Sequence, residues 1–309
     1  MWWALLAGCT IIFIDEQPQP VGDGDTDVTS DTDTDTDTDI DTDTDPTDTY
    51  YRLISVGTKH LCALDKDAKI TCWGDDEKAI DVPEKQYSWV AAGSAFSCGV
   101  TDDDVECWGA DSPGDTSHPK GVSSVTAGID FACGLSFTDE VFCWGREDFS
   151  PAAKSAIQID AGGNHVCAIA NEDTDMGLAD GQWVCWGDDA DGQTPPTTLR
   201  FKEVSAAQGH TCGISSDNPL VKCLPQDINV KEEFSTIASA LKFACGRTKE
   251  NEVQCWGFEY HKAPQVPDRL FQFLAASASA NWACGITADD GTLTNKILCW
   301  GDEVPNHLP

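Results

Sequence analysis

Short apolar stretches alternate with polar turns along the chain from Tyr50 to its end. A typical stretch is Val-Glu-Cys-Trp-Gly at residues 105–109, which follows a turn made of Thr and three Asp residues at 101–104. Alternation of apolar and polar positions over such short distances, bounded by Gly and Asp, is typical of β-strands. The pattern predicts an all-β body over residues 50–309.

The stretches belong to a unit of about 35 residues that occurs seven times. Each unit has a first cysteine, a polar turn and a second cysteine, and Trp follows the second cysteine in six units. The fifth unit has Leu224-Pro225 instead, which we expect to weaken that unit. A small residue lies five positions before the first cysteine, and an aliphatic residue or Ala lies eight before; in the seventh unit these are Ser279 and Ala276.

Each unit predicts a β-hairpin whose two cysteines face each other. Counting inward from both cysteines places Cys98 opposite Cys107 and Val100 opposite Val105. Facing residues in an antiparallel pair lie about 4.5–5.5 Å apart at Cα, which a disulfide tolerates. We expect the small residue after the first cysteine to leave room for a Trp of the same or the neighbouring hairpin. The predicted disulfides are Cys62–Cys72, Cys98–Cys107, Cys133–Cys143, Cys167–Cys185, Cys212–Cys223, Cys245–Cys255 and Cys284–Cys299.

Seven hairpins of this kind predict a seven-bladed β-propeller. Small residues before each hairpin suit inner strands that crowd towards an axis. The chain ends also complement each other, because Glu303-Val304-Pro305 resembles the start of the linker at Asp81-Val82-Pro83, and residues 50–54 resemble the end of such a linker. We therefore expect the two ends to meet and close the ring.

These residues resemble the regulator-of-chromosome-condensation repeat family over residues 50–309. The best example runs from Gly162 to Pro196 and contains His165, Cys185-Trp186-Gly187 and Gly192-Gln193. The resemblance implies a propeller fold, and among its members are nucleotide exchange factors for small GTPases, secreted inhibitors and scaffolds. The cysteine-bearing form with a Thr/Asp tether is similar to bacterial lipoproteins.

The chain begins with a short apolar segment that contains Leu6-Ala7-Gly8-Cys9, which resembles a lipobox. We interpret residues 1–8 as a lipoprotein-type signal segment and Cys9 as the lipidated residue; the odd cysteine left by seven pairs agrees with this. The segment is short and lacks Lys and Arg, so a start codon further upstream or an uncleaved hydrophobic N-terminus are the alternatives. Residues 9–49 are rich in Thr and Asp and predict a disordered tether; calcium capture by its Asp residues, or its glycosylation, stays open.

The strongly acidic composition of the chain excludes some classes of binding partner. The chain has 53 acidic and 19 basic residues and a net charge of −34, so it would be repelled by nucleic-acid backbones. We expect no nucleic acid among its partners. The cysteines lack the Cys-x-x-Cys clusters of zinc sites, so disulfides in an oxidising compartment explain them better than a metal does.

No motif for catalysis is evident in the sequence, and we expect no catalytic residue, metal or cofactor. His60, His165 and His210 lie two positions before the first cysteine, where the other four units have Phe or Trp, so we interpret them as core residues with a bonded ring nitrogen. Acidic clusters at 75–77, 102–104 and 188–191 fall in turns and are expected to be solvated.

The function predicted from these features is that of a non-enzymatic, surface-exposed lipoprotein of the bacterial envelope that binds another protein, as a monomer held to the membrane through its N-terminal lipid only. The two longest hairpin turns supply the expected partner contacts, Thr174, Asp175, Met176, Thr292 and Leu293. The alternatives are a carbohydrate-binding module or a hydrolase with an acidic central channel, and, less favoured, an exchange factor for a small GTPase.

Overall fold

The computed structural model describes residues 49–102, 104–110, 112–113, 120–146, 149–171, 177–194, 200–217, 220–226, 228–230, 232–258, 261–288 and 295–309. The signal segment at 1–8, Cys9 and the tether up to residue 48 lie outside these residues. So do the five expected partner contacts in the long turns of the fourth and seventh units.

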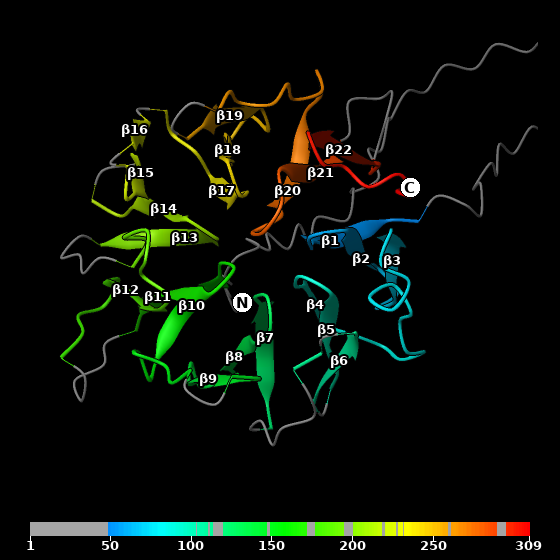
Figure 1. The fold of residues 1–309 in the computed structure, drawn as a ribbon, viewed down its shortest axis with the longest axis horizontal. Coiled ribbons are helices and arrows are strands. Elements are labelled where there is room, and N and C mark those ends of the chain that lie inside the picture. The colour runs from blue at the N-terminus through cyan, green and yellow to red at the C-terminus, as the bar shows by residue number, and fades with distance from the viewer. Residues whose placement is uncertain are drawn as a thin grey trace, which may run out of the picture.

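Seven antiparallel sheets, each a blade, surround a common axis in the described part of the chain (Figure 1). All are made of consecutive strands, and six have three strands while the fifth has four. The predicted seven-bladed propeller is therefore confirmed. The blades are β1 (Tyr51–Val56), β2 (His60–Asp65) and β3 (Ile70–Gly74); β4 (Trp89–Ala92), β5 (Phe96–Val100) and β6 (Val105–Gly109); β7 (Val122–Ala127), β8 (Ala132–Ser136) and β9 (Val141–Trp144); β10 (Ala156–Ala161), β11 (His165–Ala170) and β12 (Trp183–Gly187); β13 (Phe201–Ala207), β14 (His210–Ser215), β15 (Val221–Leu224) and β16 (Ile228–Val230); β17 (Thr236–Ser239), β18 (Phe243–Arg247) and β19 (Val253–Gly257); and β20 (Phe271–Ala276), β21 (Trp282–Thr287) and β22 (Ile297–Gly301).

Each blade consists of the predicted hairpin and an inner strand that precedes it. The inner strand pairs with the middle strand so that an aliphatic residue faces the small residue after the first cysteine, as Ile54 faces Ala63 and Val90 faces Gly99. Small residues of the inner strands, such as Ala91 and Ala206, border the axis. The small residues counted five positions before the first cysteine, such as Gly57 and Gly93, lie directly after the inner strands, and other small residues of these strands border the axis.

The seventh blade departs from the alignment made on its first cysteine. Leu274, not Ala276, faces Gly285 in that blade. Ser277, not Ser279, donates its backbone N–H to the carbonyl of Trp282, as Gly57 does to His60. Two extra residues between inner and middle strand cause the shift, and counting back from the cysteine alone does not detect them.

A disulfide joins the facing cysteines of every blade, with the seven pairs expected from the sequence. The Cα–Cα distance is 4.0 Å in six blades and 4.1 Å for Cys167–Cys185, shorter than expected. The first cysteine of each pair is fully buried, as Cys62 and Cys284 illustrate. Each blade is therefore crosslinked at its centre.

In the five units that have Gly after the first cysteine, the room beside this Gly is filled by Tyr or Phe, not by Trp as expected. A Cβ atom added to Gly99 would lie 2.5 Å from the ring of Tyr87, and one on Gly246 would lie equally close to Phe234. The Trp after the second cysteine packs on that ring instead, as Trp256 does on Phe234 at 5.6 Å between centroids. Two aromatic layers therefore cover most hairpins.

The two ends of the propeller meet, as predicted. Val304 and Leu308 pack against the core of the first blades, where Val82 also packs. The side chain of Asn295 accepts a hydrogen bond from the backbone N–H of Tyr51 at 2.6 Å and donates one to its carbonyl at 3.1 Å. His307 Nδ1 lies 2.8 Å from Asp75 Oδ1. The ring is closed by side-chain packing and hydrogen bonds between blades seven and one.

The fifth blade keeps its three strands despite Leu224-Pro225 and adds β16, which pairs with β15. Its middle and outer strands, however, pair only as far as Thr211 and Leu224. In the first and fourth blades the pairing continues by one residue, from His60 to Gly74 and from His165 to Gly187. The third blade, which keeps Trp144-Gly145, also ends its pairing at Ala132 and Trp144, so Leu224-Pro225 changes the hairpin little.

Candidate functional site

The direction of the strands gives the ring two faces. Turns that join middle to outer strands, such as 66–69 and 137–140, lie on one face, which we call the hairpin-turn face. Loops that join inner to middle strands, such as 57–59 and 208–209, lie on the other, which we call the inner-loop face.

A small cavity of about 60 Å³ lies on the axis, lined by residues of all seven inner strands. Most of the lining residues are Ala, Ser and Val, and Asp160 is the acidic residue among them. On the inner-loop side, the backbone N–H of Gln208 donates to the carbonyl of Ala278, so the long loop of blade seven reaches across to blade five. One carboxylate does not make the pair that glycoside hydrolysis needs.

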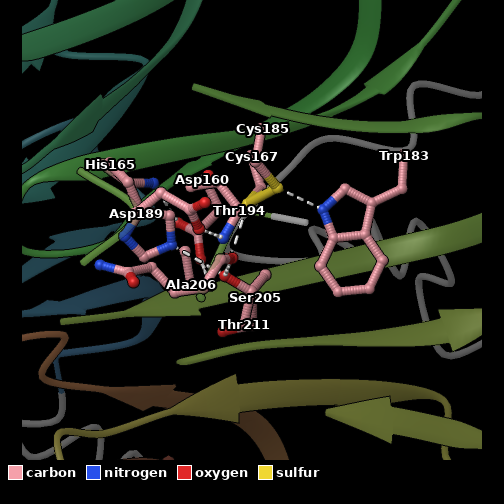
Figure 2. Close-up of a disulfide and its surroundings, with 12 residues drawn as sticks. Asp160, His165, Cys167, Trp183, Cys185, Asp189, Thr194, Ser205, Ala206 and Thr211 are labelled. Atoms are coloured by element: carbon pink, nitrogen blue, oxygen red, sulfur yellow. Dashed lines mark hydrogen bonds between the residues drawn. A yellow bond between two sulfur atoms is a disulfide. The ribbon is translucent and has the colours of Figure 1, made fainter. Parts of the chain in front are cut away.

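Asp160 connects blades four and five through its carboxylate. Asp160 Oδ2 accepts the backbone N–H of Ala206 at 2.8 Å (Figure 2). Asp160 Oδ1 accepts the hydroxyl of Thr126, in the third blade, at 3.3 Å. Burial raises the pKa of Asp160 to about 7, although these hydrogen bonds favour the charged form. Ser55, Thr126 and Ser205 accept N–H groups of the following blade in the same way, so this row of bonds fixes the inner strands to one another.

His60 and His165 each bond to a hydroxyl of the next blade. His60 Nε2 lies 2.8 Å from Ser97 Oγ, and His165 Nε2 lies 2.8 Å from Thr211 Oγ1 (Figure 2). Both imidazoles are fully buried, and burial lowers the pKa of each to about 4, so they are neutral near pH 7. Their interpretation as bonded core residues is confirmed.

His210 differs from these two histidines. It is 2% exposed, yet its Nε2 has no hydrogen-bond partner within the described residues. The next blade has Ala244 at the position where Ser97 and Thr211 supply a hydroxyl. Burial lowers the pKa of His210 to about 3. The interpretation of His210 as a packed core residue is confirmed, because the side chain is buried against Phe258, but its Nε2 lacks the hydrogen bond that His60 and His165 make. Ala244 is the sequence signal that identifies this exception.

A second cavity, of about 240 Å³, opens beside His210 on the inner-loop face. It lies between blades five and six, with Pro225 and Gln226 on one side and Lys242 and His261 on the other. Phe258 supports the ring of His210 at 3.8 Å between centroids. Sequence reasoning noted Leu224-Pro225 but did not connect it with a pocket.

Large exposed apolar side chains form another feature that the sequence did not reveal. Among the described residues these are Tyr50, Phe137 and Leu270, with 43%, 77% and 38% exposure. Tyr50 and Leu270 directly precede inner strands and Phe137 directly follows a middle strand, so all three lie on the hairpin-turn face.

The acidic turns have local roles. Asp189 Oδ1 accepts the backbone N–H of Thr194 at 2.8 Å, which lowers the pKa of this exposed carboxyl, and Asp76 Oδ1 accepts that of Ala79. The described part of the chain contains no group of three His, Cys, Asp or Glu side chains arranged to hold a metal ion. Within the same residues, no helix has the length and apolar character needed to cross a membrane.

Comparison with known proteins agrees with the ring of similar blades. Residues 122–150 match the regulator of chromosome condensation (RCC1) repeat. The chain thus contains one matched RCC1 repeat, in its third blade, and its propeller resembles the RCC1 fold. The serine/threonine-protein kinase-like protein CCR2 of Arabidopsis thaliana is 30% identical over 254 residues, which are 75% of this chain and 25% of that protein. The RCC1-like chain thus spans about a quarter of the length of this relative.

Solved structures share the RCC1-like fold. The CRINKLY WD40 ectodomain of the Arabidopsis thaliana receptor kinase ACR4 is 24% identical, with a TM-score of 0.66 over 83% of this chain and 97% of that chain. Prp20p from Saccharomyces cerevisiae is 14% identical, with a TM-score of 0.58 over 77% of this chain and 83% of that one. At these identities the likeness concerns the fold alone.

Proposed function

We propose that this RCC1-like propeller is a non-enzymatic scaffold that binds another protein through its hairpin-turn face. The observation that carries the proposal is the position of Tyr50, Phe137 and Leu270, the large exposed apolar side chains of the described residues, all on that face. Exposed aromatic and aliphatic side chains are typical anchors of protein interfaces, because their burial by a partner releases water from apolar surface.

Rigidity of the scaffold supports this function. Every blade is crosslinked by a disulfide, and Trp89 Nε1 donates to the carbonyl of Val125 in the next blade at 2.8 Å. A rigid surface loses little conformational entropy on binding, so more of the contact energy appears as affinity. Contacts from Thr174, Asp175, Met176, Thr292 and Leu293, predicted from the sequence, belong to this proposal.

A secreted or surface-exposed location fits the disulfides, which persist in oxidising compartments. We include in the proposal a signal segment at 1–8, lipidation of Cys9, a tether at 9–49 and a monomeric propeller at 50–309 in the bacterial envelope. The receptor-kinase ectodomain of similar fold supports an extracellular setting for such a propeller. Replacement of Cys9 by Ser should release the protein from membranes, and mass spectrometry should find diacylglycerol only on the unchanged protein.

The alternatives have less support. The axial cavity holds a single carboxylate, which does not favour a hydrolase or sugar site at the axis. Prp20p is described by its binding to Gsp1p and histones. For this chain, exchange-factor activity fits poorly with seven disulfides, because small GTPases of the cytosol meet reduced proteins.

Site-specific photocrosslinking on intact cells tests the proposed face. A photoreactive residue placed at Phe137 should capture one defined protein, whereas the same residue at exposed Lys59, on the inner-loop face, should not. The captured protein should then bind the purified propeller, and Phe137→Ser with Leu270→Ser should weaken this binding about tenfold or more, as expected for loss of apolar anchors. Capture from Lys59 alone, or full binding by the double variant, would contradict the assignment of the face.

A further inference from the structure

Basic side chains gather on the hairpin-turn face where blades seven and one meet, although the whole chain carries a net charge of −34. β1 lies beside β20 and β21 at this place in the ring (Figure 1). Four segments form this part of the face, namely 50–52, 65–69, 268–270 and 295–297, and we call them the junction patch. They contain five basic and three acidic residues. The five basic side chains are all exposed: Arg52, Lys66, Lys69, Arg269 and Lys296.

Contacts between the two blades bring these side chains together. Asn295, which directly precedes Lys296, bonds to both backbone groups of Tyr51 at 2.6 and 3.1 Å. Burial raises the pKa of Tyr51, and the charge of Lys296 opposes this shift, so these two side chains lie close to each other. Arg52 Nε donates to the last carbonyl of β2 at 2.9 Å, next to the turn at 66–69. The junction patch is therefore one surface shared by two blades.

Two of the three acidic residues of the junction patch are already bonded within it. Asp65 is 8% exposed, and its Oδ1 accepts the backbone N–H groups of Asp67 and Lys69 at 2.8 and 2.9 Å. Asp67 Oδ2 lies 2.9 Å from Lys66 Nζ. The remaining excess of basic charge lies on the same surface as the exposed side chain of Leu270. A chain segment that carries carboxylates is attracted to such a surface.

The most acidic part of the chain joins the propeller at this patch. Residues 15–48 contain fourteen acidic residues and no Lys or Arg, and they lead through Thr49 directly into Tyr50. Ten residues of extended chain reach about 33–36 Å, so the covalent link keeps many carboxylates near the patch, at an effective concentration of about a millimolar. A separate acidic molecule has no such link and is repelled by the net charge of the chain. The acidic segment of the chain itself is thus the favoured occupant.

We propose that residues 15–48, which we call the acidic tether, bind to the junction patch of their own chain, with carboxylates paired to its exposed Lys and Arg side chains. The acidic tether then covers Tyr50 and Leu270, while Phe137, two blades away, stays open to another protein. Single ion pairs at a surface are weak and are screened by salt, so the contact depends on their sum and weakens as the salt concentration rises. A protein partner that also contacts Leu270 must displace the acidic tether.

Photocrosslinking within the purified full-length protein tests this contact. A benzophenone-bearing residue at Leu270 should link to residues 15–48 at low salt, and the yield should fall about fivefold in about 0.5 M NaCl, where the screening length is about 4 Å. Arg52 is the first basic residue of the chain, so trypsin leaves the acidic tether in one fragment, in which tandem mass spectrometry locates the link.

Phe137 is the matched control position. It is an exposed apolar residue of the same face, but its turn contains Asp139 and Glu140 and no basic residue. The same benzophenone-bearing residue at Phe137 should link to residues 15–48 with a yield about fivefold lower than at Leu270, because like charges repel.

Charge reversal separates the patch from the total charge of the protein. Lys69→Glu with Arg269→Glu should lower the yield from Leu270 about fivefold, because two attractions become repulsions. Lys59→Glu with Lys78→Glu makes the same change in net charge at the inner-loop end of blade one and should leave the yield unchanged. All four side chains are exposed, so both variants should fold, and circular dichroism checks this.

A mixture of ¹⁵N-labelled and unlabelled protein identifies the chain that supplies the acidic tether. Links between a light and a heavy fragment would assign the contact to a second copy and overturn the proposal. So would equal yields from Leu270 and Phe137, or a yield that responds neither to salt nor to charge reversal in the patch. No external partner takes part in this contact, so its test and the capture of a partner at Phe137 on cells are independent.

Discussion

Blades four and five are neighbours in the ring, and they use the same histidine position in opposite ways. Blade four follows the repeat closely: Gly162 makes room for His165, Gly187 covers it, and Thr211 of blade five bonds to its Nε2. Blade five has Ala207, Pro225 and, from blade six, Ala244 at the corresponding positions. A residue shared by several repeats can thus have a hydrogen-bond partner for Nε2 in one blade and none in the next, depending on three small neighbours.

The disulfides should give the largest measurable difference between the two blades. Removal of Cys167–Cys185 by two Ala substitutions opens a loop with a sequence separation of 18, and removal of Cys212–Cys223 opens one of 11. We expect each change to lower the free energy of unfolding by about 3 kcal/mol, with blade four a few tenths more affected because its loop is longer. Urea denaturation measures both. A clearly larger loss in blade five would show that loop length does not control the effect.

Replacement of His165 or His210 by Phe shows how much each histidine contributes to the pH dependence of the unfolding free energy. The unfolded chain binds a proton on His below pH 6.5, whereas folded His165 and His210 bind one only near pH 4 and 3, so the unfolding free energy falls as the pH drops below 6.5. Between neutral pH and about pH 4.5, each of these histidines should lower the unfolding free energy of the unchanged protein by about 2.5 kcal/mol. The corresponding Phe variant should not show this loss.

At neutral pH the two histidine variants should differ in stability. His165→Phe loses the bond to Thr211 and should be destabilised by about 1 kcal/mol, whereas His210→Phe loses no internal bond to Nε2 and should be neutral. Thermal unfolding across the pH range checks both outcomes, and Asp160 contributes equally to all samples. Equal destabilisation of the two variants at neutral pH would mean that His210 Nε2 has a partner inside the protein.

Thr211→Val should leave Nε2 of His165 without a hydrogen-bond partner, as Nε2 of His210 already is. Val keeps the shape of Thr but leaves His165 Nε2 without its hydroxyl partner, so the unfolding free energy should fall by about 1–2 kcal/mol. Chemical denaturation provides the measurement, and Thr236→Val would be a poor control because Thr236 bonds to Glu203. Exposed Thr71→Val, which removes a hydroxyl on the surface, serves as the control and should change little.

Ala207→Gly with Ala244→Ser makes the reverse change and should have the smallest effect on stability. The new hydroxyl partner should contribute about 1 kcal/mol, and the added glycine should offset much of it. The unfolding free energy should therefore rise by a few tenths of a kcal/mol in urea denaturation. A marked destabilisation would indicate that the new hydroxyl does not reach His210 Nε2.

The sequence predicted the propeller and its hairpins because the cysteine, glycine and Trp positions recur at a fixed distance from one another. Where two residues were inserted, as before Trp282, counting from the cysteine chose Ala276 in place of Leu274. The missing hydrogen bond of His210 Nε2 was harder to predict, because it depends on a residue of the neighbouring blade. The importance of Ala244 can be recognised only once it is known that Ala244 occupies, relative to His210, the position that Ser97 occupies relative to His60.

The exposure of Phe137 was likewise not predictable from its sequence. A Phe in a hairpin turn can fold back onto the blade or point into solvent, and the pattern of apolar residues is the same in both cases. Its 77% exposure is a property of the folded turn.

The way the ring closes determines how it responds to force. Within the described residues every blade is built from consecutive strands, so none of these strands completes the sheet at the other end of the propeller. The junction of blades seven and one is held by the packing of Val304 and Leu308 and by contacts such as Asn295 with Tyr51. A pull on the two ends of the propeller loads this junction first, while the disulfides prevent the two strands of each hairpin from separating at their centre. Under tension, we expect the contact between blades seven and one to separate before the disulfide-linked hairpins do.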